Sequence, residues 1–109
     1  MRSLVILFGV AALLVIAPVS GRADNLTLTL KDHKYTPSEI KVPANKRVMI
    51  TVINNDDTAE EFDSTSLKVE KVVPGHSQGI VRIGPLPAGR YPFIGEYHEA
   101  TAKGVVIAE

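Results

Sequence analysis

The chain of 109 residues contains no cysteine. It therefore has no thiolate nucleophile, no disulfide to reinforce a small domain, no zinc site with thiolate ligands and no blue-copper centre, which needs a cysteine sulfur. An excess of basic charge is also missing, because twelve basic side chains stand against twelve acidic ones and form no basic stripe. We therefore expect no nucleic-acid partner. Hydrolase chemistry is not expected either, since no Ser-His-Asp order, Gly-rich phosphate loop or paired-acid pattern stands out.

The longest apolar run, residues 4–19, lies at the N terminus. It follows Arg2 and is followed by small residues up to Ala23, a pattern that predicts a secretory signal peptide over residues 1–23. Its 16 residues are fewer than the roughly 20 that span a bilayer, so an uncleaved anchor is the less favoured alternative. Cleavage leaves residues 24–109, with ten basic and twelve acidic side chains and a formal charge of −2. We expect this domain to be periplasmic and not inserted in a membrane.

Apolar and polar residues alternate with a period of two along most of the remaining chain, and turns rich in Gly, Pro and Asn separate the alternating stretches. No helical period is present. This pattern predicts an all-β antiparallel sandwich or barrel. Seven short strands are predicted, at residues 26–31, 39–43, 47–54, 67–73, 78–83, 91–95 and 103–108.

Three further expectations follow from the same pattern. Residues 54–61 are too polar for a core and are predicted to form a long acidic loop. Met49 is expected to fill the core from the opposite side of its strand to Val48. His76 lies in a Pro-Gly-His-Ser sequence, which is typical of a turn rather than of a ligand position.

The last two predicted strands enclose the most chemically suggestive stretch. An apolar strand ends at Gly95, and Glu96, His98 and Glu99 follow it in a short polar segment. Imidazole and carboxylate groups this close together, presented between two strands, are typical of a metal site on a loop.

Several fragments of this sequence occur in an order that is characteristic of a known family. They are residues 35–45 (YTPSEIKVPAN), 47–55, the Pro-Gly at 74–75, 87–93 (PAGRYPF) and 98–105. Together they resemble the cupredoxin superfamily, and more narrowly the small EfeO-type cupredoxin-like periplasmic proteins that accompany bacterial ferrous-iron uptake systems. The resemblance covers nearly all of residues 24–109 and implies a Greek-key β-sandwich of about seven short strands.

The departures from the superfamily pattern are equally informative. Copper-binding cupredoxins have a first histidine soon after an Asn-rich corner, and this chain has Glu60 there. They have a cysteine three residues before the second histidine, and this chain has Gly95. The axial methionine would fall at Ala102 or Lys103, so only His98 remains of the usual ligands. The resemblance therefore excludes type 1 copper and the role of a fast, high-potential electron carrier.

The superfamily fold nevertheless brings the Asn-corner loop and the last hairpin loop to the same end of the sandwich. The resemblance thus implies a metal site without sulfur, assembled from His98, Glu96, Glu60 or Glu61, and His33. Imidazole and carboxylate ligands suit Cu(II), iron or zinc, and copper in such a site would be type-2-like. The acidic residues nearby would concentrate cations such as Fe²⁺.

A subgroup resemblance, carried by residues 32–37, 60–64 and 93–98, implies a function. It is an accessory role in iron uptake, with copper as cofactor and ferrous iron oxidised or handed over. The implied partners are a periplasmic iron-binding protein and a membrane permease. No catalytic residue is assigned. Two alternatives stay open, namely a metal-free interaction module that docks on a transporter and a periplasmic copper chaperone.

Overall fold

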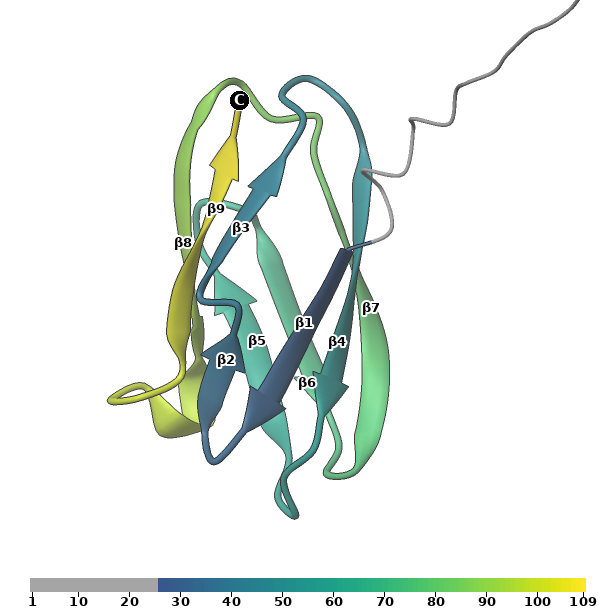
Figure 1. Cartoon of the computed structure of the whole chain (residues 1–109), viewed down its shortest axis with the longest axis vertical. Helices are drawn as coiled ribbons and strands as arrows, with labels where there is room; N and C mark the ends of the chain where they lie inside the picture. Colours follow the sequence, from purple (N-terminus) through teal and green to yellow (C-terminus); the bar gives the residue numbers. More distant parts are fainter. Residues whose placement is uncertain (1–25) are drawn as a thin grey trace, which may run out of the picture.

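The computed structural model describes residues 26–109, which form two β-sheets packed face to face (Figure 1). The predicted signal peptide, residues 1–23, lies outside the described residues. One sheet has the strand order β2-β1-β4-β7 and the other β3-β9-β8-β5-β6. The strands are β1 (Leu26–Lys31), β2 (Lys34–Thr36), β3 (Glu39–Val42), β4 (Val48–Asn54), β5 (Glu60–Ser64), β6 (Val69–Val73), β7 (Ser77–Ile83), β8 (Gly89–Gly95) and β9 (Lys103–Ala108), with the 3₁₀ helix η3 (Glu96–His98) between the last two.

The predicted all-β sandwich is confirmed, with nine strands in place of about seven. The two additional strands are β2 and β5. The expectation of a wholly antiparallel arrangement is wrong, because β1 pairs with β4 and β3 pairs with β9 in parallel. These parallel pairs arise because the chain passes between the sheets after β2 and again after β3, so that a later strand returns beside an earlier one in the same direction. Within the described residues, no helix is long and apolar enough to cross a bilayer.

The core lies between the sheets and is built from the inward-facing half of each alternating strand. Its centre is aromatic: the rings of Phe62 and Phe93 stack with centroids 4.8 Å apart, and Tyr35 meets Phe93 edge-on at 5.3 Å. Met49 does not belong to this core, and the prediction that it does is wrong. Because Val48 faces inward, the next residue on a pleated strand faces outward, and Met49 is 43% exposed.

The prediction of a solvated acidic loop over residues 54–61 is also wrong in part. Asn54, Asp56 and Glu60 are all buried, and Glu60 is the first residue of β5. Burial is tolerated because each polar group has partners. The Asn54 amide, for example, donates to the carbonyls of Thr58 and Val73, at 2.9 and 3.0 Å, and accepts from the Asp56 N–H at 2.9 Å.

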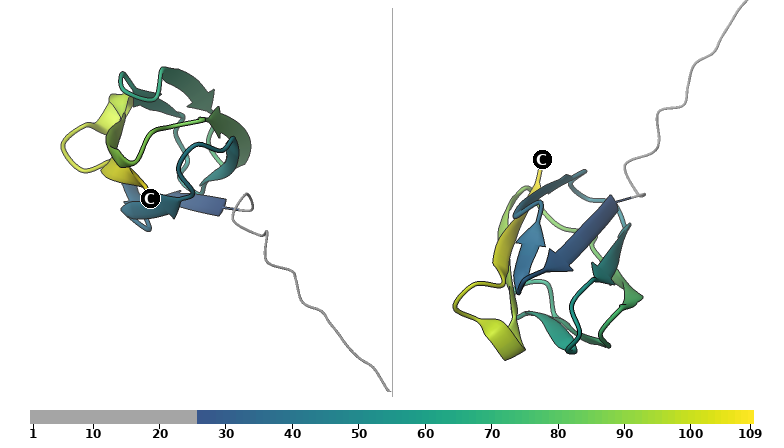
Figure 2. Two further views of the ribbon diagram at one scale, coloured as in Figure 1. Left: turned by 90° about the horizontal axis from the view of Figure 1, so that it is seen from above. Right: turned by 60° about the horizontal axis from the view of Figure 1, so that its bottom comes forward.

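Three connections gather at one end of the sandwich, the lower end in Figure 1 and the end turned forward in the right-hand view of Figure 2. They are the turn between β1 and β2, the loop after β4, and η3 with the loop that follows it. Segments far apart in sequence thereby approach one another at this end.

Candidate metal centre

Glu60 and Gly95 occupy one small space at the start of β5 and the end of β8. A Cβ at position 95 would lie 2.6 Å from Cδ and 2.8 Å from Oε1 of Glu60, and 2.8 Å from Cβ of Ala102. Contacts this short are not tolerated in a packed interior. The absence of a side chain at Gly95 therefore makes room for the Glu60 carboxylate.

The Glu60 carboxylate, only 2% exposed, is held by three polar contacts. Its Oε2 accepts hydrogen bonds from the N–H of Tyr97 at 2.7 Å and of Glu61 at 3.1 Å, and its Oε1 lies 2.7 Å from Nδ1 of His98. An ionised carboxylate can only accept hydrogen bonds, so Nδ1 of His98 is the donor. The other ring nitrogen of His98, Nε2, then carries the lone pair that a metal ion would use.

His33 reaches the same place from the two-residue turn between β1 and β2. Asp32 and His33 both have positive φ, 53° and 58°, in a hairpin turn that usually takes Asn or Gly. Asp56 holds the turn: its carboxylate accepts the N–H of Asp32 at 2.7 Å and of His33 at 2.9 Å. Burial raises the pKa of Asp56, but these two backbone hydrogen bonds outweigh it, so that the pKa lies below its usual value.

The imidazole rings of His33 and His98 lie face to face, with centroids 3.6 Å apart and planes 11° from parallel. Nδ1 of His33 approaches Oδ2 of Asp56 at 3.4 Å but is buried without a hydrogen-bond partner. Each ring thus has its Nδ1 toward a buried carboxylate, and the side chains of His33 and His98 are 41% and 27% exposed. The pair has the supporting carboxylates that metal-bound histidines commonly have.

Glu61 and Glu96, the other two predicted ligands, lie elsewhere. They form an acidic group with Asp63 on the outer side of β5 and η3. A hydrogen bond with Asp63 and the negative charge of Glu61 raise the pKa of Glu96 to about 7. The structure therefore brings together His33, His98 and Glu60, and separates Glu61 and Glu96 from them.

Two more residues belong to the surroundings of the site. Asp56 was expected only as one member of a solvated acidic run, and no sequence signal marks it as the residue that holds His33. Tyr35 is in the core, and its hydroxyl is buried without a hydrogen-bond partner. Burial and the nearby charge of Glu60 raise its pKa. His76 lies in a turn, as predicted, with its Nε2 2.6 Å from Asp57.

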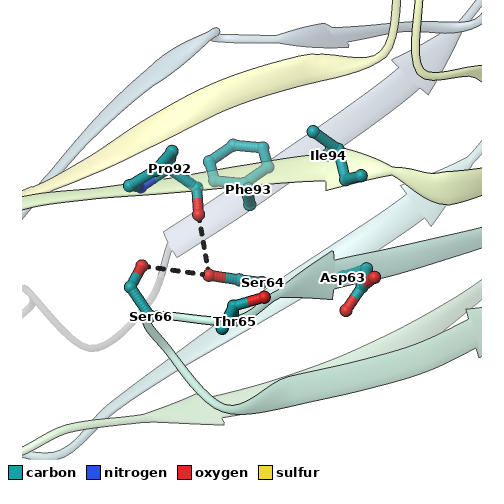
Figure 3. Close-up of a pocket in the computed structure, with 7 residues that line it drawn as sticks. All are labelled: Asp63, Ser64, Thr65, Ser66, Pro92, Phe93 and Ile94. Atoms are coloured by element: carbon teal, nitrogen blue, oxygen red, sulfur yellow. Dashed lines mark hydrogen bonds between the residues drawn. The ribbon is translucent and has the colours of Figure 1, made fainter.

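A cleft of about 360 Å³ at the other end of β5 does not contribute to the site. It opens where β5 and β8 separate, since these strands pair only at Phe62 with Gly95 and at Asp63 with Ile94. Figure 3 shows the Ser64 hydroxyl between Ser66 and the Pro92 carbonyl, to which it donates at 2.7 Å. This hydroxyl links β5 to β8 where the backbone pairing of the two strands has ended.

The donor chemistry of the site suits copper, although the present arrangement is incomplete. The lone pair of an imidazole lies in the ring plane, so two nearly parallel rings cannot both direct Nε2 at one ion. Within residues 26–109, no three His, Asp or Glu side chains converge on one ion position. To bind one shared ion, one ring would have to turn. His33 is the less restrained of the two, because its Nδ1 has no hydrogen-bond partner.

The two-sheet topology, with histidine and carboxylate groups at one end, defines a sandwich of the cupredoxin type. The family model for cupredoxin-like domains matches residues 4–108. The chain belongs to the cupredoxin-like domain family. An uncharacterized protein of Rickettsia prowazekii (strain Madrid E) is 39% identical over 80 residues, which cover 73% of this chain. The matched region spans 64% of the length of that relative.

Solved structures share the fold at low sequence identity. The metal-binding domain of the Cu(I)-exporting P-type ATPase CopA of Streptococcus pneumoniae D39 superposes with a TM-score of 0.69 at 15% identity, covering 85% of this chain and 92% of that domain. A copper-binding protein in its apo form gives 0.68 at 20% identity, with coverages of 78% and 86%. Amicyanin from Paracoccus versutus gives 0.61 at 17% identity, with coverages of 80% and 83%. At these sequence identities, the similarity shows a shared fold and nothing more.

Proposed function

We propose that this chain binds one copper ion through Nε2 of His33 and of His98, and that it assists ferrous-iron uptake in the periplasm. The supporting observation is the stacked histidine pair, 3.6 Å between centroids, with each Nδ1 directed at a buried carboxylate. In this proposal Glu60 orients the His98 ring, and Asp56 holds the backbone of the turn that carries His33. The copper-binding proteins that share the fold make copper the first ion to test.

His33 has a left-handed backbone, φ 58°, which costs a residue with a side chain about 1 kcal/mol relative to glycine. The two-residue hairpin turn between β1 and β2 requires this conformation, and Asp32 and His76 share it. The backbone cost therefore belongs to the turn and is not evidence for a ligand role.

Iron enters the proposal through the resemblance of residues 32–37, 60–64 and 93–98 to components of iron uptake. Copper, when bound, supplies one-electron redox chemistry, which is what oxidation of Fe²⁺ to Fe³⁺ requires. The acidic group of Glu61, Asp63 and Glu96 would raise the local concentration of Fe²⁺ on the outer side of β5 and η3. Alternatively, the chain would assist iron uptake by handing iron over to a periplasmic iron-binding protein and a permease.

A second candidate is a metal-free interaction module. The observation in its favour is that the Glu60 carboxylate is already fully engaged with Tyr97, Glu61 and His98. An end of the sandwich stabilised in this way needs no metal to hold it together.

Calorimetric titration with Cu(II) distinguishes the two candidates. We expect one ion per chain in the parent protein, no measurable binding in His98→Ala, and affinity lowered about 10–100-fold in Glu60→Gln, which alters the group that orients His98. His76→Ala is the matched control, because His76 also contacts a carboxylate but lies outside the pair, and it should bind like the parent. Titration without a saturable site in the parent protein would favour the interaction module. Oxidation is then tested by measuring how fast Fe²⁺ disappears from solution. The loss should be faster with copper-loaded than with copper-free protein.

A further inference from the structure

The outer face of the four-stranded sheet differs in charge from the rest of the molecule. Along β1, β2, β4 and β7, the outward positions hold threonines, one glutamine, apolar residues and the basic residues Lys31, Lys34 and Arg82. None of these outward strand positions is acidic. The opposite, five-stranded sheet carries both signs of charge, with acidic residues at Glu39, Glu61, Asp63 and Glu70 and exposed basic residues at Lys41, Arg90 and Lys103.

One end of this acid-free face combines exposed apolar groups with unpaired arginines. Met49 pairs across the strands with Arg82, and Met49 and Ile80 are 43% and 42% exposed. A cleft of about 360 Å³ lies there, lined in part by Arg47, Met49 and Arg82. Across residues 26–109, the ion pairs within 4.0 Å all involve histidines, so neither arginine has a carboxylate partner.

The N-terminal segment joins the sheet at this same end. Leu26 pairs with Ile50, two residues after Val48 at the start of β4. Residues 20–25 connect Leu26 to the apolar run 4–19, and six residues extend at most about 20 Å. While the apolar run is attached and lies in a bilayer, the Arg47–Arg82 end is therefore held close to the lipid surface.

We propose that this face, at its Arg47–Arg82 end, binds the anionic surface of a phospholipid bilayer. Guanidinium groups match phosphate geometry, and Met49 and Ile80 contact the headgroup region. The five-stranded sheet carries acidic as well as basic residues, so an anionic surface attracts it less and it faces away. The seven residues of β4, about 20 Å of strand, separate Arg47 from Asn54 at the histidine end, so that the metal site is directed toward solvent and partner proteins.

Vesicle flotation tests this proposal on residues 24–109, which contain both sheets and every described core residue. We expect the protein to bind vesicles of equimolar phosphatidylglycerol and phosphatidylcholine at low salt, and not pure phosphatidylcholine. The double variant Arg47→Glu with Arg82→Glu should lose at least roughly 30-fold in partitioning, because each basic residue near such a surface contributes about fivefold.

The matched control is Lys41→Glu with Arg90→Glu, which changes the net charge equally but on the five-stranded sheet. It should retain most of the binding. Met49→Asn, which alters no charge, should weaken binding only if the side chain contacts lipid, as proposed. Equal losses in the two double variants would overturn the assignment to this face. Failure of the parent protein to bind the anionic vesicles would overturn the proposal, and an acidic protein would then be the occupant to test.

Discussion

Substitution of Gly95 by alanine is the sharpest test of how the site is built. The added methyl group would lie 2.6 Å from Cδ of Glu60 and 2.8 Å from Cβ of Ala102. Overpacking of this kind costs about 1–3 kcal/mol. Displacing the carboxylate also weakens its three polar contacts, and one hydrogen bond to a charged group is worth about 1.5–3 kcal/mol. We therefore expect Gly95→Ala to lower the free energy of unfolding by about 3–5 kcal/mol, measured by urea denaturation followed by circular dichroism.

A double-mutant cycle separates this explanation from general damage to the core. In Gly95→Ala with Glu60→Ala, the methyl group no longer meets a carboxylate, so the double variant should be more stable than the sum of the two single changes by at least about 1 kcal/mol. Gly79→Ala is the control, because there a new Cβ meets mainly the flexible end of Lys71, at 3.1 Å. Strict additivity, or a cost below about 0.5 kcal/mol for Gly95→Ala, would refute the reasoning.

Three further predictions concern other parts of the molecule. The raised pKa of Glu96, about 7 against 4.5, means that the folded chain holds this proton more tightly than the unfolded chain. Its contribution to stability is therefore present below pH 4.5 and lost as the pH rises toward 7. Glu96→Gln should flatten the pH dependence of the melting temperature in that window. His33→Gly should leave stability unchanged or raise it by up to about 1 kcal/mol, while abolishing the copper binding seen by calorimetry; marked destabilisation would contradict the strain argument. Asn54→Ala should cost about 2–4 kcal/mol in denaturant melts, because it removes the hydrogen bonds of the buried Val73 carbonyl, the part-buried Thr58 carbonyl and the Asp56 N–H, whereas a cost near zero would show that water replaces the amide.

Much of the fold follows from local pattern. The alternation in residues 26–31 and 47–54 marks half-buried strands because each pleated strand presents every second side chain to the core. The strand at Glu60–Ser64 could not be recognised in the same way. Its inward positions include Glu60 and Ser64, which are polar, and burial of polar groups depends on partners that only the folded chain supplies.

In the site, too, some features could be predicted from the sequence, whereas others depend on contacts between distant segments. The resemblance implied that Glu60 or Glu61 would approach His98, and the structure places Glu60 there. The reason for this choice is not local, since the N–H of Tyr97, 37 positions along the chain, donates to Oε2 of Glu60. The roles of Asp56 and Gly95 could not be predicted from the sequence either, because each residue acts through a contact between distant segments. Metal binding and the identity of the metal both stay predictions.

Electron paramagnetic resonance of the protein with one equivalent of Cu(II) tests metal binding by the histidine pair most directly. With ¹⁵N-labelled histidine, pulsed measurements should detect two imidazole nitrogens coupled to the copper, and this signal should be lost in His33→Ala and in His98→Ala, while His76→Ala leaves the spectrum unchanged. A spectrum of free aqueous Cu(II), or one that survives loss of both His33 and His98, would contradict the proposed centre.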